Sequence, residues 1–366
     1  MGDYYFKENI QIHDYAYIFL CGVSLNYRNM REDKRIVLSE FLKDVDENNR
    51  PIILEKYFVA NKKSYYQKLT YEEAGFKNLY QVEMLVNFLS DANFIILESI
   101  STGAEAGLFL GVPEAQKKTC LLIPDEMAVE EDKLGAFLRL AFRSTYVNIL
   151  KFYPQIKHNK TSENVFQWFT FFNQNEIGEK LGTDIQDFLY KNVSERGICF
   201  TANKLNIKKG KIYYKMEDCN LQIEIQPRVL MICFASILNC PEYEAEFFSK
   251  AGHTVLEIEK IVVEWLEEVF INSIAEKVGN KALNCSIKIH ANIDKMSVNK
   301  AIGMILYLFS ASELLSIKKN EDYQITKKIV ISKKMVSIDG KENQYFYYKY
   351  RDCIGAVIER KIGKEW

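Results

Sequence analysis

Short apolar runs alternate with amphipathic segments along residues 15–126. The apolar runs are YAYIFLCG at 15–22, IIL at 52–54, NFIILES at 93–99 and KTCLLIPDE at 118–126. Between them, KRIVLSEFLKDV at 34–45 and NLYQVEMLVNFLSDA at 78–92 repeat apolar residues at helical spacing. Strands that alternate with helices predict βαβ units, and therefore an α/β fold with a doubly wound, mostly parallel sheet.

This alternation stops near residue 150. The segments at 165–181 and 254–278 have helical period, while KGKIYYKM and LQIEIQP favour short strands. VNKAIGMILYLFSASELL at 298–315 predicts a helix, followed by two or three strands joined by turns, which is the closing pattern of a winged helix. The sequence therefore predicts three domains: an α/β domain at 1–150, a mostly helical middle region at 151–290, and a winged-helix-like domain at 291–366.

Composition and charge narrow the class of protein. Lysine plus arginine (48) nearly cancels aspartate plus glutamate (49), so bulk charge indicates no polyanionic partner. No signal peptide opens the chain, and the longest apolar run, VLMICFASIL, is about half of the ~20 residues that span a bilayer. We therefore expect a cytoplasmic protein that does not bind membranes. Eight scattered cysteines without C-x-x-C, and four histidines, predict buried reduced thiols and no metal site.

Acidic side chains gather where ligands bind in such folds, outside the carboxyl ends of parallel strands. Glu55 and the pair Glu98-Ser99 follow predicted strands, as does Cys21-Gly22. Glu105 stands two residues after Gly103 in the small-residue run STGAEAG, so we expect it in or just before the first turn of the next helix. Glu105 could also serve only to stabilise the start of the helix, because a carboxylate in the first turn gains roughly 0.3–1 kcal/mol from the helix dipole.

Glu83 adds a further carboxyl group on the helix before that strand, beside apolar positions, although a solvated surface glutamate would fit the same place. Several carboxylates above a parallel sheet suit chemistry at an anomeric carbon, since the sequence has no Ser-His-Asp spacing, G-x-G-x-x-G loop or metal-ligand cluster. One carboxylate attacks or shields the oxocarbenium-like centre, and its partner handles protons or ribose hydroxyls. The pattern predicts cleavage of an N-glycosidic bond.

A family resemblance rests on the order IFLCG, RIVLSEFL, LEKYF, VEMLVNFLSDANFIILESISTGAEAGLF and KTCLLI. Over residues 17–123 this array resembles the nucleoside deoxyribosyltransferase-like domain of bacterial retron anti-phage effectors, in which helices and a C-terminal winged helix follow. A weaker similarity covers residues 290–335. The resemblance implies that Glu105 is the nucleophile and Glu83 an acidic partner for ribose or base. The residues it places around the substrate are Cys21, Gly22, Ser24, Arg35, Glu55, Glu98, Ser99 and Gly103.

Arg35 matches a basic position of that family and could meet a phosphate, or could simply be solvated at a helix start. By the same resemblance the substrate is NAD or a related nucleotide, no cofactor is needed, and an oligomer is expected. Lysine pairs and tyrosines in the tail favour single-stranded nucleic acid, although lysines also protect exposed edge strands. We assign this contact to Lys327, Lys328, Lys333 and Lys334.

The resulting hypothesis is a toxic retron effector, an N-glycosidase held inactive by its reverse transcriptase and by multicopy single-stranded DNA (msDNA) or its non-coding RNA. Two alternatives stay open at this point. One is a metabolic nucleoside deoxyribosyltransferase, which would need no extension beyond the α/β domain. The other is a catalytically dead nucleotide sensor or DNA-binding regulator that keeps the fold for binding alone.

Overall fold

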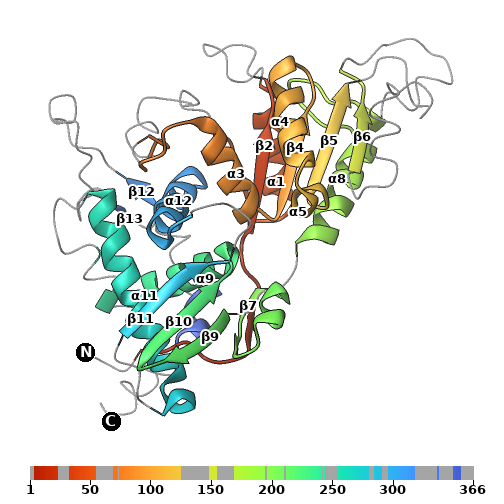
Figure 1. Cartoon of the computed structure of the whole chain (residues 1–366). Coiled ribbons are helices and arrows are strands. Elements are labelled where there is room, and N and C mark those ends of the chain that lie inside the picture. The colour runs from red at the N-terminus through yellow and green to blue at the C-terminus, as the bar shows by residue number, and fades with distance from the viewer. Residues whose placement is uncertain are drawn as a thin grey trace, which may run out of the picture. The chain divides into compact units, whose positions relative to one another are not determined.

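The computed structural model describes residues 4–23, 33–54, 69–72, 74–124, 148–154, 169–193, 196–209, 212–240, 242–243, 247, 254–279, 284–290, 296–317, 336–337 and 349–355. The chain divides into two compact units (Figure 1). The α/β unit comprises Tyr15–Ala60 and Glu83–Ser194, and the second unit comprises Met1–Asp14, Asn61–Val82 and Glu195–Trp366.

A five-stranded parallel sheet forms the centre of the α/β unit, in the order β3-β2-β4-β5-β6. Its strands are β2 (Ala16–Cys21), β3 (Asn49–Ile52), β4 (Ala92–Ile96), β5 (Thr119–Pro124) and β6 (Asn148–Phe152). All residues of β2, β3 and β4 are buried, as expected of a parallel sheet covered by helices on both faces. The predicted parallel α/β architecture is confirmed in this part of the chain.

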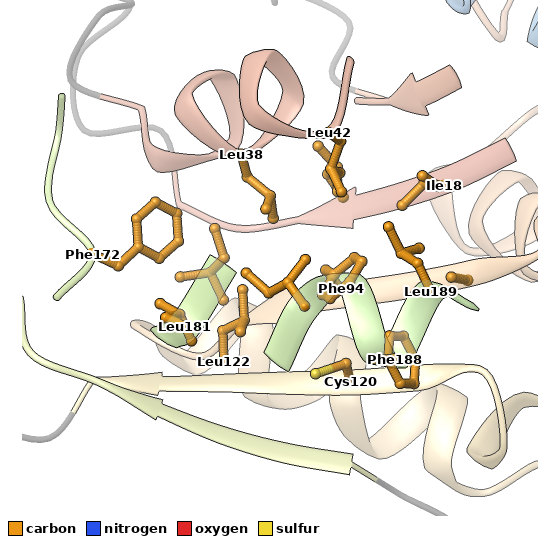
Figure 2. Close-up of a cluster of buried hydrophobic side chains, with 14 of the residues drawn as sticks. Ile18, Leu38, Leu42, Phe94, Cys120, Leu122, Phe172, Leu181, Phe188 and Leu189 are labelled. Atoms are coloured by element: carbon orange, nitrogen blue, oxygen red, sulfur yellow. The ribbon is translucent and has the colours of Figure 1, made fainter. Parts of the chain in front are cut away.

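The helices of this unit are α1 (Lys34–Val45), α3 (Leu79–Leu89, which belongs to this unit from Glu83 onward), α4 (Ile100–Leu110), α5 (Pro113–Gln116) and α8 (Glu179–Asn192). Helices α1 and α8 cover one face of the sheet (Figure 2). Leu38 and Leu42 of α1 and Phe188 of α8 meet Ile18 and Phe94 from the strands there. This apolar cluster holds α1 in place behind β2.

Helices α3 and α4 lie on the opposite face, because strand side chains alternate between the two faces. Phe19, the neighbour of the clustered Ile18, packs against Phe109 of α4 with ring centroids 5.7 Å apart. Asn93, the neighbour of Phe94, donates to the Asn87 side chain of α3 over 2.7 Å. Cys21 is two residues after Phe19 in β2, so its side chain points to the same face of the sheet, toward α3 and α4.

The α/β unit is longer than the sequence predicts, because the expected edge at residue 150 falls inside β6. Helix α8 completes the apolar cluster, so residues up to 194 belong to this unit rather than to a middle domain. The helical interpretation of 165–181 is also wrong in part. Phe171 and Phe172 form β-bridges, and α8 begins only at Glu179. Strand β3 likewise lies slightly earlier than the predicted 52–54.

The second unit contains a four-stranded mixed sheet in the order β11-β10-β9-β8 and a pairing of β1 with β7. Its strands are β1 (Ile10–Ile12), β7 (Arg196–Ile198), β8 (Phe200–Thr201), β9 (Ile212–Glu217), β10 (Asn220–Ile225), β11 (Asn284–Ile289), β12 (Ser316–Ile317) and β13 (Val336–Ser337). Its helices are η3 (Lys204–Lys209), α9 (Pro227–Leu238), α11 (Val255–Val278), α12 (Val298–Ala311) and η4 (Arg351–Cys353). The strands predicted at KGKIYYKM and LQIEIQP are confirmed.

The expected domain at 291–366 does not stand apart from the rest of the second unit. Every residue of α9 is buried, and ten consecutive residues of α12, Ala301–Ser310, are buried as well. After α12, strands β12 and β13 pair antiparallel. Helix α12 is therefore a core element of the larger unit. Among the described residues, no helix is long and apolar enough to cross a membrane.

Candidate functional site

The order of the strands singles out one edge of the parallel sheet. The chain leaves β2 through α1 toward β3 on one side, and returns through α3 to β4 on the other side of β2. Ligands of open α/β sheets bind at such a switch point, outside the carboxyl ends of the two central strands. Here those ends carry Cys21-Gly22 after β2 and Glu98-Ser99 after β4, as the sequence predicts.

Glu105 lies on α4, but one turn deeper than expected. Ser99 is the N-cap of α4, and its side chain accepts from the Thr102 N–H while the Thr102 hydroxyl accepts from the Ser99 N–H. This capping box starts the helix at Ile100, so Glu105 lies in the second turn and STGAEAG is helical rather than a loop. A helix-dipole role in the first turn therefore does not describe Glu105, whose Oε2 atom is buried.

Glu83 of α3 is buried, with 8% of its surface exposed, which excludes the reading as a solvated surface residue. Helix α3 is fixed over the sheet by a polar network below it. The Ser90 hydroxyl donates to Asn93 over 2.7 Å, and Lys118 donates to the carbonyl oxygen of Ser90 over 2.8 Å. These contacts hold the C-terminal end of the helix that carries Glu83.

Cys21, Glu83 and Glu105 form one electrostatic cluster. Burial raises the pKa of the Cys21 thiol well above its ordinary value, and the charges of Glu105 and Glu83 raise it further. Burial, and then the charge of Glu105, raises the pKa of Glu83 to about 7. One carboxyl group of the cluster is thus suited to hold a proton near neutral pH, and the thiol stays protonated.

Arg35 lies beside this cluster, and its guanidinium group forms an ion pair with Asp33. Its Nη2 atom is 2.6 Å from Oδ2 of Asp33, and both side chains are almost fully buried. A Cβ atom on Gly22 would come within 2.9 Å of the Arg35 Cγ atom, so glycine permits this close approach. Arg35 is therefore neither a solvated helix-start residue nor an exposed phosphate ligand. Its charge lowers the pKa of Cys21.

Glu98 forms an ion pair with Lys34, whose Nζ atom also lies 5.2 Å from the centroid of the Phe152 ring. This pair ties the start of α1 to the end of β4. Sequence reasoning did not identify Lys34 or Asp33 as part of the site. The available signal was the charged run REDKR, which leads into the first turn of α1.

A family model with the description "STM3845 retron effector protein" matches residues 31–216. This chain belongs to that retron effector family. It is therefore the effector of a retron defence system. The matched segment runs from just before α1 into β9 and includes Glu83, Glu105 and Arg35, whereas Cys21 precedes it. No curated protein matches the chain.

Gly103 and six further residues complete the set predicted for the sites of this retron effector. Gly103 is exposed, with no atom within 4 Å of the position a Cβ would take. Ser24, Glu55 and the lysines Lys327, Lys328, Lys333 and Lys334 lie outside the described residues. Among the residues that the structure describes, no group of three or more His, Cys, Asp or Glu side chains is arranged to hold a metal ion.

Ser99 was expected to contact substrate, and its capping role predicts a different mutational result. Replacing Ser99 by alanine should lower the free energy of unfolding by about 1 kcal/mol, while Ser99→Asp, which also caps helices, should restore it. Urea denaturation measures both effects, with Ser101→Ala on the exposed side of α4 as the control. A stable Ser99→Asp retron effector that has lost its activity would show that Ser99 also contacts the substrate.

Proposed function

We propose that this retron effector is an N-glycosidase that cleaves the N-glycosidic bond of NAD or a related nucleotide. The observation that carries the proposal is the pair of carboxyl groups at the switch point of the sheet, the half-buried Glu105 on α4 and the buried Glu83 on α3. Their different environments favour a proton on Glu83, whose pKa is raised to about 7. Enzymes that cleave glycosidic bonds commonly use two carboxyl groups, one of which carries a proton while the other is ionised.

In the proposed reaction a carboxylate oxygen of Glu105 bonds to the anomeric carbon of ribose. The C–N bond breaks, and its electron pair stays with the leaving base, which is nicotinamide in the case of NAD. Water then hydrolyses the ribosyl ester and regenerates the carboxylate. Protonated Glu83 donates a hydrogen bond to a ribose hydroxyl, or gives its proton to a base that needs one.

The choice of NAD follows from the resemblance to deoxyribosyltransferase-like retron effectors, as does the assignment of Glu105 as nucleophile. The pKa shifts of Cys21 and Glu83, which the charge of Glu105 helps to raise, support the pairing of the two glutamates.

Mass spectrometry after incubation of the pure protein with NAD and a nucleoside mixture tests the proposal. Release of nicotinamide from NAD, or of free base from a nucleotide, supports an N-glycosidase. Exchange of bases between nucleosides would point to a metabolic deoxyribosyltransferase instead. A pure, folded protein that turns over none of these substrates would contradict the proposal and favour a nucleotide sensor or DNA-binding regulator.

We also propose that the retron reverse transcriptase and msDNA hold the effector inactive. Membership of the retron effector family supports an association with a retron system. In residues 317–366 basic residues outnumber acidic ones and tyrosines are frequent, which suits contact with phosphates and stacking on bases. This part of the proposal rests on the sequence of the tail.

Reversing the charges of Lys327, Lys328, Lys333 and Lys334 to glutamate is expected to reduce copurification with nucleic acid by at least tenfold, because phosphate contacts dominate such binding. The measurement is the amount of nucleic acid recovered with the effector expressed from its operon. The matched control reverses the exposed lysines Lys43, Lys117, Lys180 and Lys191 of the α/β unit. Equal recovery from the two quadruple variants would refute the assignment of the tail.

A further inference from the structure

A network of buried polar side chains joins the C-terminal half of α3 to the sheet, and Asn93 of β4 is at its centre. The Asn93 side chain is fully buried. Its amide nitrogen donates to the side-chain oxygen of Asn87 over 2.7 Å and to the Thr119 hydroxyl over 3.3 Å. Its amide oxygen accepts from the Ser90 hydroxyl over 2.7 Å. The network therefore connects α3 with both β4 and β5.

The neighbours of Asn93 fix the orientation of its amide group. The Thr119 hydroxyl donates to the Ala115 carbonyl oxygen over 2.7 Å, so its own oxygen is the atom that accepts from Asn93. The amide nitrogen therefore lies on the side of Thr119 and Asn87, and the amide oxygen lies toward Ser90. Because buried polar groups without partners are costly, this network favours a single placement of α3 on β4.

The hydrogen bond between Asn87 and Asn93 constrains α3 in a way that apolar packing does not. Asn87 has 2% of its surface exposed, and its neighbour Val86 is fully buried. Apolar burial has no preferred direction, so a slight turn of the helix changes it little. A hydrogen bond weakens steeply as its angle departs from linearity. The asparagine pair therefore sets the rotation of α3 about its own axis.

Glu83 lies one helical turn from Asn87 on the same face of α3, because residues four apart in a helix lie one above the other. Two residues, Ser90 and Asp91, separate α3 from β4, so the helix and the strand run in opposite directions. The step from Asn87 back to Glu83 therefore leads about 6 Å toward the carboxyl end of β4, at 1.5 Å per residue. A rotation of α3 that breaks the asparagine pair would turn Glu83 by the same angle.

We propose that Asn87 and Asn93 are positioning residues, whose hydrogen bond sets the rotation of α3 and so directs the Glu83 carboxyl group at the substrate. This inference rests on the proposed N-glycosidase function and adds to it two residues that act through Glu83. Asn93 precedes Ile96, the last residue of β4, by three residues, or about 10 Å of strand. The pair is thus set back from the edge of the sheet at which the substrate is proposed to bind.

The double variant Asn87→Ala/Asn93→Val separates this role from a purely structural one. Alanine suits a helix and valine suits a strand, and replacing both partners of a buried hydrogen bond by apolar groups can be nearly neutral for stability. Ser90 and Thr119 keep their hydrogen bonds to backbone carbonyl oxygens. We therefore expect the double variant to melt close to the wild-type temperature. Asn87→Ala alone gives the same measurements should the double variant not fold.

Activity should change although the fold does not. The double variant is expected to lower kcat by roughly tenfold with little change in KM, because a misplaced Glu83 weakens the transition state more than the bound substrate. The decline of base release should move to lower pH. A Glu83 side chain turned away from Glu105 and toward solvent loses part of the rise in its pKa. A folded double variant with the wild-type kcat and the wild-type pH profile would overturn the inference.

Asn49→Val is the matched control. Asn49 is also a buried asparagine near the start of a parallel strand, and its side chain also bonds to a helix, donating to the Leu42 carbonyl oxygen of α1 over 2.8 Å. The variant is expected to lower the melting temperature while kcat and the pH profile of base release stay unchanged. If Asn49→Val and the double variant shift the pH profile equally, the effect is a general loss of stability and the inference is wrong.

NMR titration of the Glu83 carboxyl carbon, assigned with Glu83→Gln, tests the positioning without relying on activity. The pKa of Glu83 is expected to be about 7 in the wild type and in Asn49→Val, and lower in the double variant. Equal pKa values in all three proteins would show that the asparagine pair does not place Glu83. If the pKa falls in the double variant but the wild type releases no base, the placement of Glu83 by the pair is supported and the proposed function alone fails.

Discussion

Glu105→Gln is expected to lower base release by about four orders of magnitude or more, because glutamine keeps the shape of the side chain but removes the charge that captures the anomeric carbon. A residue of the second helical turn with no chemical role would instead change turnover by less than about threefold, since the dipole acts on the first turn. The measurement is base release by the purified variant, followed by mass spectrometry over long incubation.

The control for this experiment is Glu114→Gln, which makes the same change at an exposed glutamate in the first turn of α5. Thermal melting establishes that both variants are folded. A folded Glu105→Gln protein that releases base as fast as Glu114→Gln would remove the nucleophile from the proposed mechanism. Such a result would leave the carboxyl pair without a catalytic explanation.

The second large effect concerns Glu83 and pH. Because burial and Glu105 raise the pKa of Glu83 to about 7, its proton is present below that pH and lost above it. Base release is therefore expected to be high at pH 5–6 and to decline as the pH rises through about 7. Glu83→Gln, which donates a hydrogen bond but carries no acidic proton for acid catalysis, should lower kcat by roughly 100-fold and abolish this decline.

The same proton links stability to pH. A carboxyl group whose pKa rises from 4.5 in the unfolded chain to about 7 in the fold stabilises the protein fully below about 4.5 and loses this contribution as the pH rises through about 7. Glu83→Gln should flatten that slope in urea denaturation. Glu259 on α11, buried and with its pKa also raised to about 7, is the control. Glu259→Gln should flatten the stability slope without changing the pH dependence of base release, and the opposite outcome would contradict the role of Glu83.

The parts of the fold with long, regular patterns could be predicted from the sequence. Helices α1 and α11 and strands β2, β4 and β5 carry full periodicity or continuous apolar runs. Strand β6 was missed because NILKF is short and has no repeating pattern. Helix α12 was predicted within its observed bounds, and its residues 301–310 are mostly apolar on every side, which is typical of a helix buried all round.

The candidate site also has parts that could be predicted from the sequence and parts that could not. The strand-end rule predicted that Cys21-Gly22 and Glu98-Ser99 follow the two central strands, whereas the grouping of Glu83 with Glu105 came from the family resemblance. The start of α4 was misplaced because Gly103 was read as part of a turn, while the Ser99–Thr102 capping box decides where the helix begins. The partners of Glu98 and Arg35 could not be predicted, because the run REDKR permits several pairings and only side-chain packing selects among them.

The path of the chain between its two compact units limits how proteolysis or gene fusion can separate them. The chain passes between them after residues 14, 60, 82 and 194, so no single proteolytic cut releases an intact α/β unit. A cut after residue 194 would place β1 and β7 on different fragments, although β7 is the only pairing partner of β1 among the described strands. Gene fusions that exchange one contiguous half would break both cores in the same way. Release of the intact α/β unit from the rest of the chain therefore requires more than one cut.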